Sequence, residues 1–154
     1  MEMRKTEALC PIVEHERVGS GLYLMKLADE AISHQAQPGN FVMVSVSDGS
    51  HPLLKRPLGI LKVQPPFFWL LYEVVGEGTG LLARRQPGDQ VRVLGPLGRP
   101  FPSFQDRDLL VVAGGIGIVP VYYAMEAMAA GNRVSLVYGA RSREHLVLRD
   151  WIEA

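Results

Sequence analysis

Cysteine is nearly absent from this sequence of 154 residues, in which Cys10 is the only one. A single cysteine excludes an internal disulfide, and it cannot hold an iron–sulfur cluster alone because such clusters take about four cysteine ligands. The four histidines, His15, His34, His51 and His145, are scattered without metal-ligand spacing, so we expect no metal site. Because a chain without disulfides is typical of a reducing compartment, we expect a cytoplasmic protein.

Net charge is also missing, since 16 lysines and arginines balance 16 aspartates and glutamates. This balance disfavours the basic surface that nucleic acids and anionic membranes require. The first residues, MEMRKTEALC, lead into charged residues and do not resemble a signal peptide. The uncharged run Leu109–Met125 has 17 residues, includes three glycines and Pro120, and is too short to predict a membrane span.

Apolar residues are plentiful, at 47% of the chain, so a sizeable core can form. In the first two thirds of the sequence they occur in short runs separated by turn signals such as Pro38-Gly39 and Asp48-Gly49. The expected strands are Glu7–Val13, Gly21–Ala28, Asn40–Ser47, Leu58–Val63, Phe67–Val75 and Gln90–Leu94. Short strands at this spacing predict a closed antiparallel barrel. One short helix is expected among them, at Gly80–Arg85, opened by Thr79.

The pattern changes in the last third of the chain. Leu109–Ala113 is a continuous apolar run, as expected of a parallel strand buried on both faces. A helix is expected from Pro120, then a strand at Arg133–Tyr138 and a second helix capped by Ser142. This is one βαβ unit, whereas a doubly wound nucleotide domain needs several more strands, so we expect an incomplete α/β domain. The predicted domains are residues 1–101 and 107–154.

Three glycines, Gly114, Gly115 and Gly117, lie between the first of these strands and its helix. Such a loop lets backbone N–H groups approach a phosphate closely. It differs from the dinucleotide fingerprint, because Pro120 stands where a third spaced glycine belongs and no Asp or Glu ends the second strand. Arg141 follows that strand instead and suits a 2′-phosphate. The alternative is a glycine turn that only lets the helix pack against the strand.

Two further clusters suit phosphate recognition. Lys55 and Arg56 stand at the start of a strand and are followed by Pro57, where a guanidinium can bind phosphate in bidentate fashion. Gly78 and Thr79 open the short helix, whose N–H groups and hydroxyl could cap a second phosphate. Each cluster also has an ordinary interpretation, as a basic strand entry and as a plain helix cap.

Five motifs occur in a fixed order along the chain. They are PGNFVM (38–43), LLKRP (53–57), GEGT (76–79), VLGPLG (93–98) and GGIGIVP (114–120). In this order they resemble the ferredoxin reductase superfamily, and within it the electron transfer subunits of class B dihydroorotate dehydrogenases. The resemblance extends from Gln37 to the C-terminus and is specific, because five ordered motifs must coincide.

The resemblance implies a six-stranded antiparallel Greek-key barrel that binds FAD, followed by a partial, C-terminally truncated nucleotide-binding α/β domain. It places FAD on Arg56, Pro57, Leu58, Gly59, Leu71, Tyr72, Glu73, Gly78 and Thr79. It places NAD on Gly114, Gly115, Gly117, Pro120 and Arg141. The cofactors then carry the chemistry, and no side chain is expected to act catalytically.

The implied function is that of a flavoprotein subunit in pyrimidine biosynthesis. It passes electrons via FAD between NAD and a dihydroorotate-oxidising catalytic subunit that bears FMN, in a cytoplasmic oligomer. Family members also use a [2Fe–2S] cluster, whose cysteine ligands are absent from this chain. A stand-alone NAD(P)H:flavin-type reductase and a non-catalytic flavin-binding or interaction module remain open, as does the choice between NAD and NADP.

Two residues depart from the family pattern. Gly59 stands where Ser or Thr is usual, which removes a hydroxyl near the flavin N5. Glu73 stands where a basic residue is common, and a carboxylate there would place negative charge near the cofactor phosphates.

Overall fold

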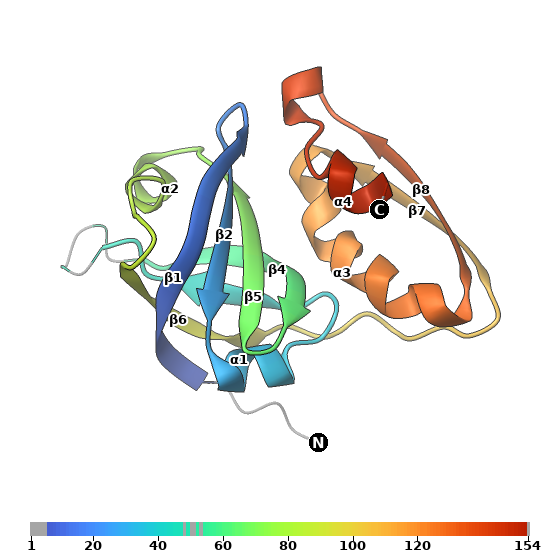
Figure 1. Cartoon of the computed structure of the whole chain (residues 1–154), viewed down its shortest axis with the longest axis horizontal. Helices are drawn as coiled ribbons and strands as arrows, with labels where there is room; N and C mark the ends of the chain where they lie inside the picture. Colours follow the sequence, from blue (N-terminus) through green and yellow to red (C-terminus); the bar gives the residue numbers. More distant parts are fainter. Residues whose placement is uncertain (1–5, 48, 50–51, 53, 154) are drawn as a thin grey trace.

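The computed structural model describes residues 6–47, 49, 52 and 54–153, so Asp48, His51 and Leu53 lie outside the described residues. Figure 1 shows two parts, a β-barrel on the left and a smaller α/β unit on the right. The barrel strands are β1 (Thr6–Gly19), β2 (Leu22–Ala28), β3 (Phe41–Val44), β4 (Arg56–Gln64), β5 (Phe67–Glu73) and β6 (Gln90–Leu97), with the short helices α1 (Glu30–Gln35) and α2 (Glu77–Leu82) between them. The second part contains β7 (Asp108–Gly114), α3 (Ile118–Met128), β8 (Arg133–Gly139) and α4 (Arg149–Glu153).

The six barrel strands pair antiparallel in the closed order β1-β2-β5-β4-β3-β6. Closure removes the unpaired edges that an open sheet would expose. Side chains alternate along β5, where Phe68, Leu70 and Tyr72 join the cluster inside the barrel while Trp69 and Leu71 join a second cluster outside it. The predicted fold class, an antiparallel barrel followed by a partial α/β unit, is confirmed.

Strand β1 is much longer than the strand expected at Glu7–Val13. Its first half pairs with β6 and its second half with β2. Register shifts between Ile12 and Glu14 and between Arg17 and Gly19 accompany the change of neighbour. The charged residues that follow the expected strand are largely exposed, so the hydrophobic pattern fades there although the strand continues.

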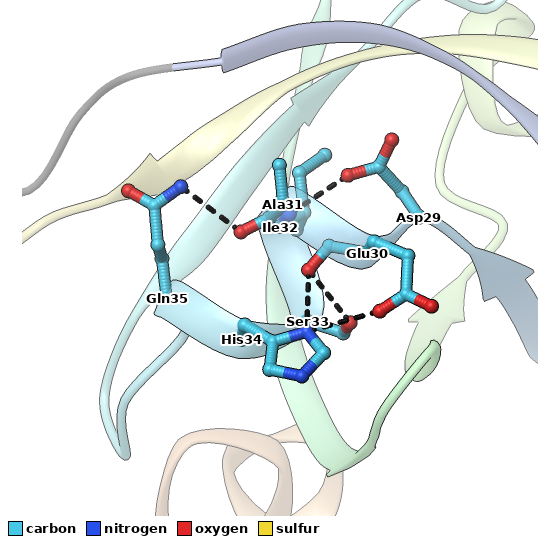
Figure 2. Close-up of polar contacts among 7 residues, drawn as sticks. All are labelled: Asp29, Glu30, Ala31, Ile32, Ser33, His34 and Gln35. Carbon is cyan, nitrogen blue, oxygen red and sulfur yellow. Dashed lines mark hydrogen bonds and ion pairs between the residues drawn. The ribbon is translucent and has the colours of Figure 1, made fainter.

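Helix α1 has no counterpart among the predicted elements. Its N-cap is Asp29, whose Oδ1 accepts a hydrogen bond from the Ile32 N–H at 2.7 Å (Figure 2). Glu30 adds an acidic side chain to the first turn, where its negative charge interacts favourably with the positive end of the helix dipole. Six residues are too few to display helical periodicity, so the cap at Asp29 is the main signal in the sequence.

The prediction of a second helix capped by Ser142 is wrong in position. Arg143–His145 form a single 3-10 turn, and the α-helix α4 begins only at Arg149. Ser142 makes no side-chain cap bond, and its Oγ contacts the Nδ1 of His145 at 2.7 Å. The hydroxyl is therefore used within a side-chain network rather than to start a helix. Two other 3-10 turns, Gly115–Gly117 and Ala129–Gly131, flank α3.

The second part is the predicted βαβ unit. Strands β7 and β8 pair in parallel along their whole length, from Asp108 opposite Arg133 to Gly114 opposite Gly139. Helix α3 connects them, and Pro120 lies in its first turn, where a missing N–H costs nothing.

Helix α3 lies between the barrel and the β7–β8 sheet (Figure 1). Its Ile118, Val119 and Tyr122 are buried in the same cluster as Leu61 and Leu71 of the barrel wall. Helix α4 extends this contact, because the Trp151 ring meets the Trp69 ring edge-on at 6.3 Å between centroids. The α/β unit is thus attached to the barrel by an apolar interface.

The opposite face of the β7–β8 sheet is exposed. Leu110 and Val112 are each 69% exposed and Val137 is 57% exposed. These side chains alternate with Leu109, Val111 and Leu136, which are partly buried on the side of α3. Among the helices that the structure describes, none is long and apolar enough to cross a membrane.

Candidate functional site

A cleft of 540 Å³ lies between the barrel and the start of α3. The predicted flavin residues that line it are Arg56, Pro57, Leu58, Gly59, Leu71, Tyr72, Glu73 and Thr79. Ile116, Val119 and Pro120 form its opposite wall. The start of β4, at residues 56–59, and the end of β5, at residues 71–73, therefore meet at this cleft.

Arg56 is the cation of this cleft. Its guanidinium lies over Gly78, where a Cβ would come within 2.7 Å of the arginine Cζ. Only glycine leaves room for this approach, which brings the guanidinium to the first turn of α2. The Nη1 of Arg56 donates to the Leu54 carbonyl, which fixes the side chain. The two predicted phosphate clusters, one on Arg56 and one on Gly78, thus converge.

Thr79 has a different local role from the one expected. Helix α2 begins at Glu77 instead of Gly80, so Thr79 is its third residue and not its N-cap. The Thr79 hydroxyl accepts hydrogen bonds from the N–H groups of Val75 at 3.0 Å and Gly76 at 3.3 Å. It therefore shapes the turn that leads into α2, and it lines the cleft from there.

Gly59 lies where β4 touches α3. A Cβ on Gly59 would come within 2.8 Å of the Val119 Cγ1. The glycine at this position is therefore matched by close packing of Val119 against β4. A serine or threonine at this position would have to displace the Val119 side chain.

Tyr72 lines the first cleft but turns its ring into the barrel, where it joins the buried cluster. Its hydroxyl lies 3.0 Å from the Nε2 of His15, and its ring stacks on Tyr23 at 5.8 Å. Burial raises the pKa of the Tyr72 hydroxyl, which therefore stays protonated and donates to His15. The Nδ1 of His15 then donates to the Arg85 carbonyl at 2.8 Å. Tyr72 accordingly supports the cleft from behind.

A second cleft of 450 Å³ lies beside the first and shares Ile116 and Glu73 with it. Of the predicted NAD residues, Gly114, Gly115 and Arg141 line it. Gly115 has φ +51°, a left-handed conformation that favours glycine. The other two predicted NAD residues are placed differently.

Neither Gly117 nor Pro120 reaches the second cleft. Gly117 caps the start of α3 and lines neither cleft, and Pro120 lines the first cleft. A Cβ at Gly114, Gly115 or Gly117 would meet open space, so a ligand can approach this loop closely.

Some lining residues were not among the predicted site residues. Asn40 is one of them, and its amide organises the loop beside the first cleft by accepting from the Gln37 N–H at 2.8 Å and donating to the Gly98 carbonyl at 3.2 Å. The PGNFVM motif was the signal for it. Ile116 and Val119 belong to the GGIGIVP motif, but their apolar side chains gave no reason to place them at a cofactor. Within the described parts of the chain, no three His, Cys, Asp or Glu side chains gather as a metal site.

Comparison with curated proteins finds relatives along nearly the whole chain. The electron transfer subunit of dihydroorotate dehydrogenase B (NAD(+)) from Shouchella clausii is 36% identical over 147 residues, which cover 92% of this chain and 57% of the relative. The electron transfer subunit homolog from Aquifex aeolicus is 31% identical over 144 residues, with the same coverage. This chain is a homologue of those electron transfer subunits. No protein-family model matches it.

Solved structures agree with this relationship. A NADH-dependent reduced ferredoxin-NADP oxidoreductase superposes with a TM-score of 0.85 at 28% identity, over 94% of this chain and 52% of that one. The cytochrome P450 reductase of Amycolatopsis superposes with a TM-score of 0.81 at 16% identity, over 99% and 48%, which shows the shared fold alone. The resemblance to the electron transfer subunits that the sequence indicated is confirmed. This chain spans 57% of the length of the two curated relatives named above.

Proposed function

We propose that this protein binds FAD in the first cleft and transfers electrons between the FAD and a nicotinamide dinucleotide in the second cleft. The observation that carries the proposal is the convergence on one cleft of every predicted flavin residue except Gly78, which itself lies under Arg56. When bound, FAD supplies a carrier that takes electrons in pairs and passes them on singly.

The residues of the first cleft fit such a cofactor. Its volume lies in the range of about 300–1,000 Å³ that is usual for cofactor sites. Arg56 supplies a guanidinium for a phosphate, and the glycine at position 78 leaves the backbone open beside it. Leu58 and Val119 offer apolar walls to a flat ring. The roles of these residues toward FAD stay predictions.

The second cleft lies where a dinucleotide could react with this flavin. It adjoins the first cleft, and the two share Ile116 and Glu73, so a dinucleotide bound in the second cleft would extend beside the flavin. Gly114 and Gly115 leave the N–H groups of the loop accessible to a pyrophosphate.

The wider role is inferred from the relatives. We propose that this protein consists of two domains, residues 1–101 and 107–154. It would transfer electrons to or from an FMN-bearing dihydroorotate-oxidising subunit in pyrimidine biosynthesis, as part of a cytoplasmic oligomer. A [2Fe–2S] cluster would need ligands from outside this chain, because Cys10 is its only cysteine and is fully buried.

The test is spectroscopic. The purified chain is mixed with FAD, passed through a desalting column, and titrated with NADH without oxygen. We expect a bound flavin spectrum that NADH bleaches. A chain that retains no flavin contradicts the proposal.

A second candidate is a non-catalytic flavin-binding or interaction module. It is favoured by the exposed apolar face of the β7–β8 sheet, which leaves the nucleotide unit covered on one side only. Flavin that binds but is not bleached by NADH would support this candidate against the first. NADH oxidation by an isolated chain with free flavin as acceptor would instead support a stand-alone reductase.

A further inference from the structure

Glu73 occupies the junction of the two clefts. It is the last residue of β5, pairs with Leu22 of β2, and lines both clefts. Its Oε1 lies 2.8 Å from the Nη2 of Arg141, which stands just beyond the end of β8. The Glu73 side chain is 27% exposed, so its carboxylate remains accessible from the cleft.

Arg141 is held in place by its neighbours. Its Nη2 also donates to the Nε2 of His145 at 2.6 Å, and the Nδ1 of His145 donates to the Oγ of Ser142 at 2.7 Å. Both hydrogens of this Nη2 are therefore used, one on Glu73 and one on His145. The result is a carboxylate from the barrel fixed beside the end of β8.

Dinucleotide-binding βαβ units usually carry an acidic side chain at the end of the second strand, where it accepts a hydrogen bond from the ribose 2′-hydroxyl. Strand β8 ends at Gly139 without such a residue. We propose that Glu73, delivered from the barrel and positioned by Arg141, takes this place and selects a dinucleotide with a free 2′-hydroxyl over one with a 2′-phosphate. The inference rests on dinucleotide binding in the second cleft, as given under the proposed function.

Charge in the second cleft favours this selection. Among its lining residues, Glu73 is the only carboxylate and Arg141 the only Lys or Arg, and the two form an ion pair. A 2′-phosphate would face the Glu73 carboxylate and would have to compete with it for Arg141. A ribose hydroxyl meets no repulsion and can donate to the second carboxylate oxygen. An unpaired Arg141 would reverse the preference.

The experiment measures dissociation constants for NAD+ and NADP+ by calorimetry on the FAD-loaded chain, so that no turnover occurs. Glu73→Gln keeps the shape of the side chain and removes its charge. We expect wild type to prefer NAD+, and the variant to bind NADP+ about three- to fivefold more tightly and NAD+ more weakly, as is usual for one partly exposed ion pair. The double variant Glu73→Gln/Arg141→Met should lose the gain for NADP+.

The matched control is Asp108→Asn, which breaks the 2.8 Å ion pair with Arg133 at the far end of the same sheet and should leave both constants unchanged. The flavin spectrum of each variant verifies that the first cleft is intact. If Glu73→Gln changes the ratio of the two constants by less than about twofold while NAD+ still binds, the inference is overturned and the proposed function stands. If wild type holds FAD but binds neither dinucleotide, both the inference and the nicotinamide part of the proposed function are overturned.

Discussion

The barrel and the βαβ unit differ in how completely their sheets are buried. In the barrel every strand has two neighbours, and residues such as Phe68 and Leu70 are fully enclosed. In the βαβ unit only one face of the two-stranded sheet is covered, and Leu110 and Val112 are 69% exposed on the other. The barrel holds its own core, whereas the βαβ unit obtains much of its burial from the barrel.

The difference shows where rigidity for the candidate site comes from. Most of the first cleft is built on barrel strands, and α3 adds a wall only because Val119 and Tyr122 pack on the barrel. Lys62 of β4 reinforces this contact with an ion pair to Glu126 at 2.8 Å. The second cleft depends on the unit with fewer buried contacts. We therefore expect the flavin site to be the more stable of the two.

The largest expected effect comes from replacing one side chain in each region. Phe68→Ala, inside the barrel, should lower the free energy of unfolding by about 3–5 kcal/mol, because it leaves a cavity that the closed sheet cannot fill. Val112→Thr, on the exposed face, should change it by less than about 0.5 kcal/mol. Urea denaturation followed by tryptophan fluorescence measures both. Similar losses in the two variants would contradict the comparison.

Thiol labelling should distinguish the enclosed barrel interior from the exposed face of the βαβ unit. Burial, followed by the charge of Asp29, raises the pKa of the Cys10 thiol to about 12 from its usual value of 9.0. The thiolate population at pH 8 should then be about a thousandfold below that of an exposed cysteine. A thiol reagent should leave native Cys10 unmodified and label Val112→Cys rapidly in a Cys10→Ala background. Labelling of native Cys10 at the rate of the unfolded chain would show that the barrel interior is open.

The contact between the two regions is tested at Gly59. Gly59→Ser should destabilise the chain by about 1–3 kcal/mol, because the new side chain overlaps Val119. Adding Val119→Ala should recover part of this loss, since it removes the atom that the serine meets. Thermal unfolding of the four proteins of this cycle measures the coupling. Independent, additive effects would mean that β4 and α3 do not meet at this point.

The sequence predicted most of the barrel because its signals are local. Alternating apolar residues and turn pairs marked strands that the structure largely confirms, although the charged half of β1 and the last three residues of β6 escaped notice. Helix α1 was missed because six residues show no periodicity, and α2 was placed too late because Thr79 was taken for its cap. The errors at Thr79 and Ser142 arose because each hydroxyl bonds within a turn or a side-chain network instead of starting a helix.

The candidate site was predictable only in part. Ordered motifs pointed to Arg56 and Gly78, but no pattern showed that the guanidinium lies over the glycine. The pairing of Glu73 with Arg141 joins residues 68 positions apart and follows from how the two parts pack, which local sequence rules do not encode. Likewise, Gly59 is explained by Val119, a residue of another element.

The central claim is that FAD binds in the first cleft on Arg56. The most direct measurement is the dissociation constant of FAD for wild type, Arg56→Met and the control Arg133→Met, followed by the visible spectrum. We predict that Arg56→Met weakens FAD by at least about tenfold, because a charge-assisted phosphate contact is lost, and that Arg133→Met, on the far end of the βαβ unit, leaves it unchanged. Equal affinities in the three proteins would contradict the account.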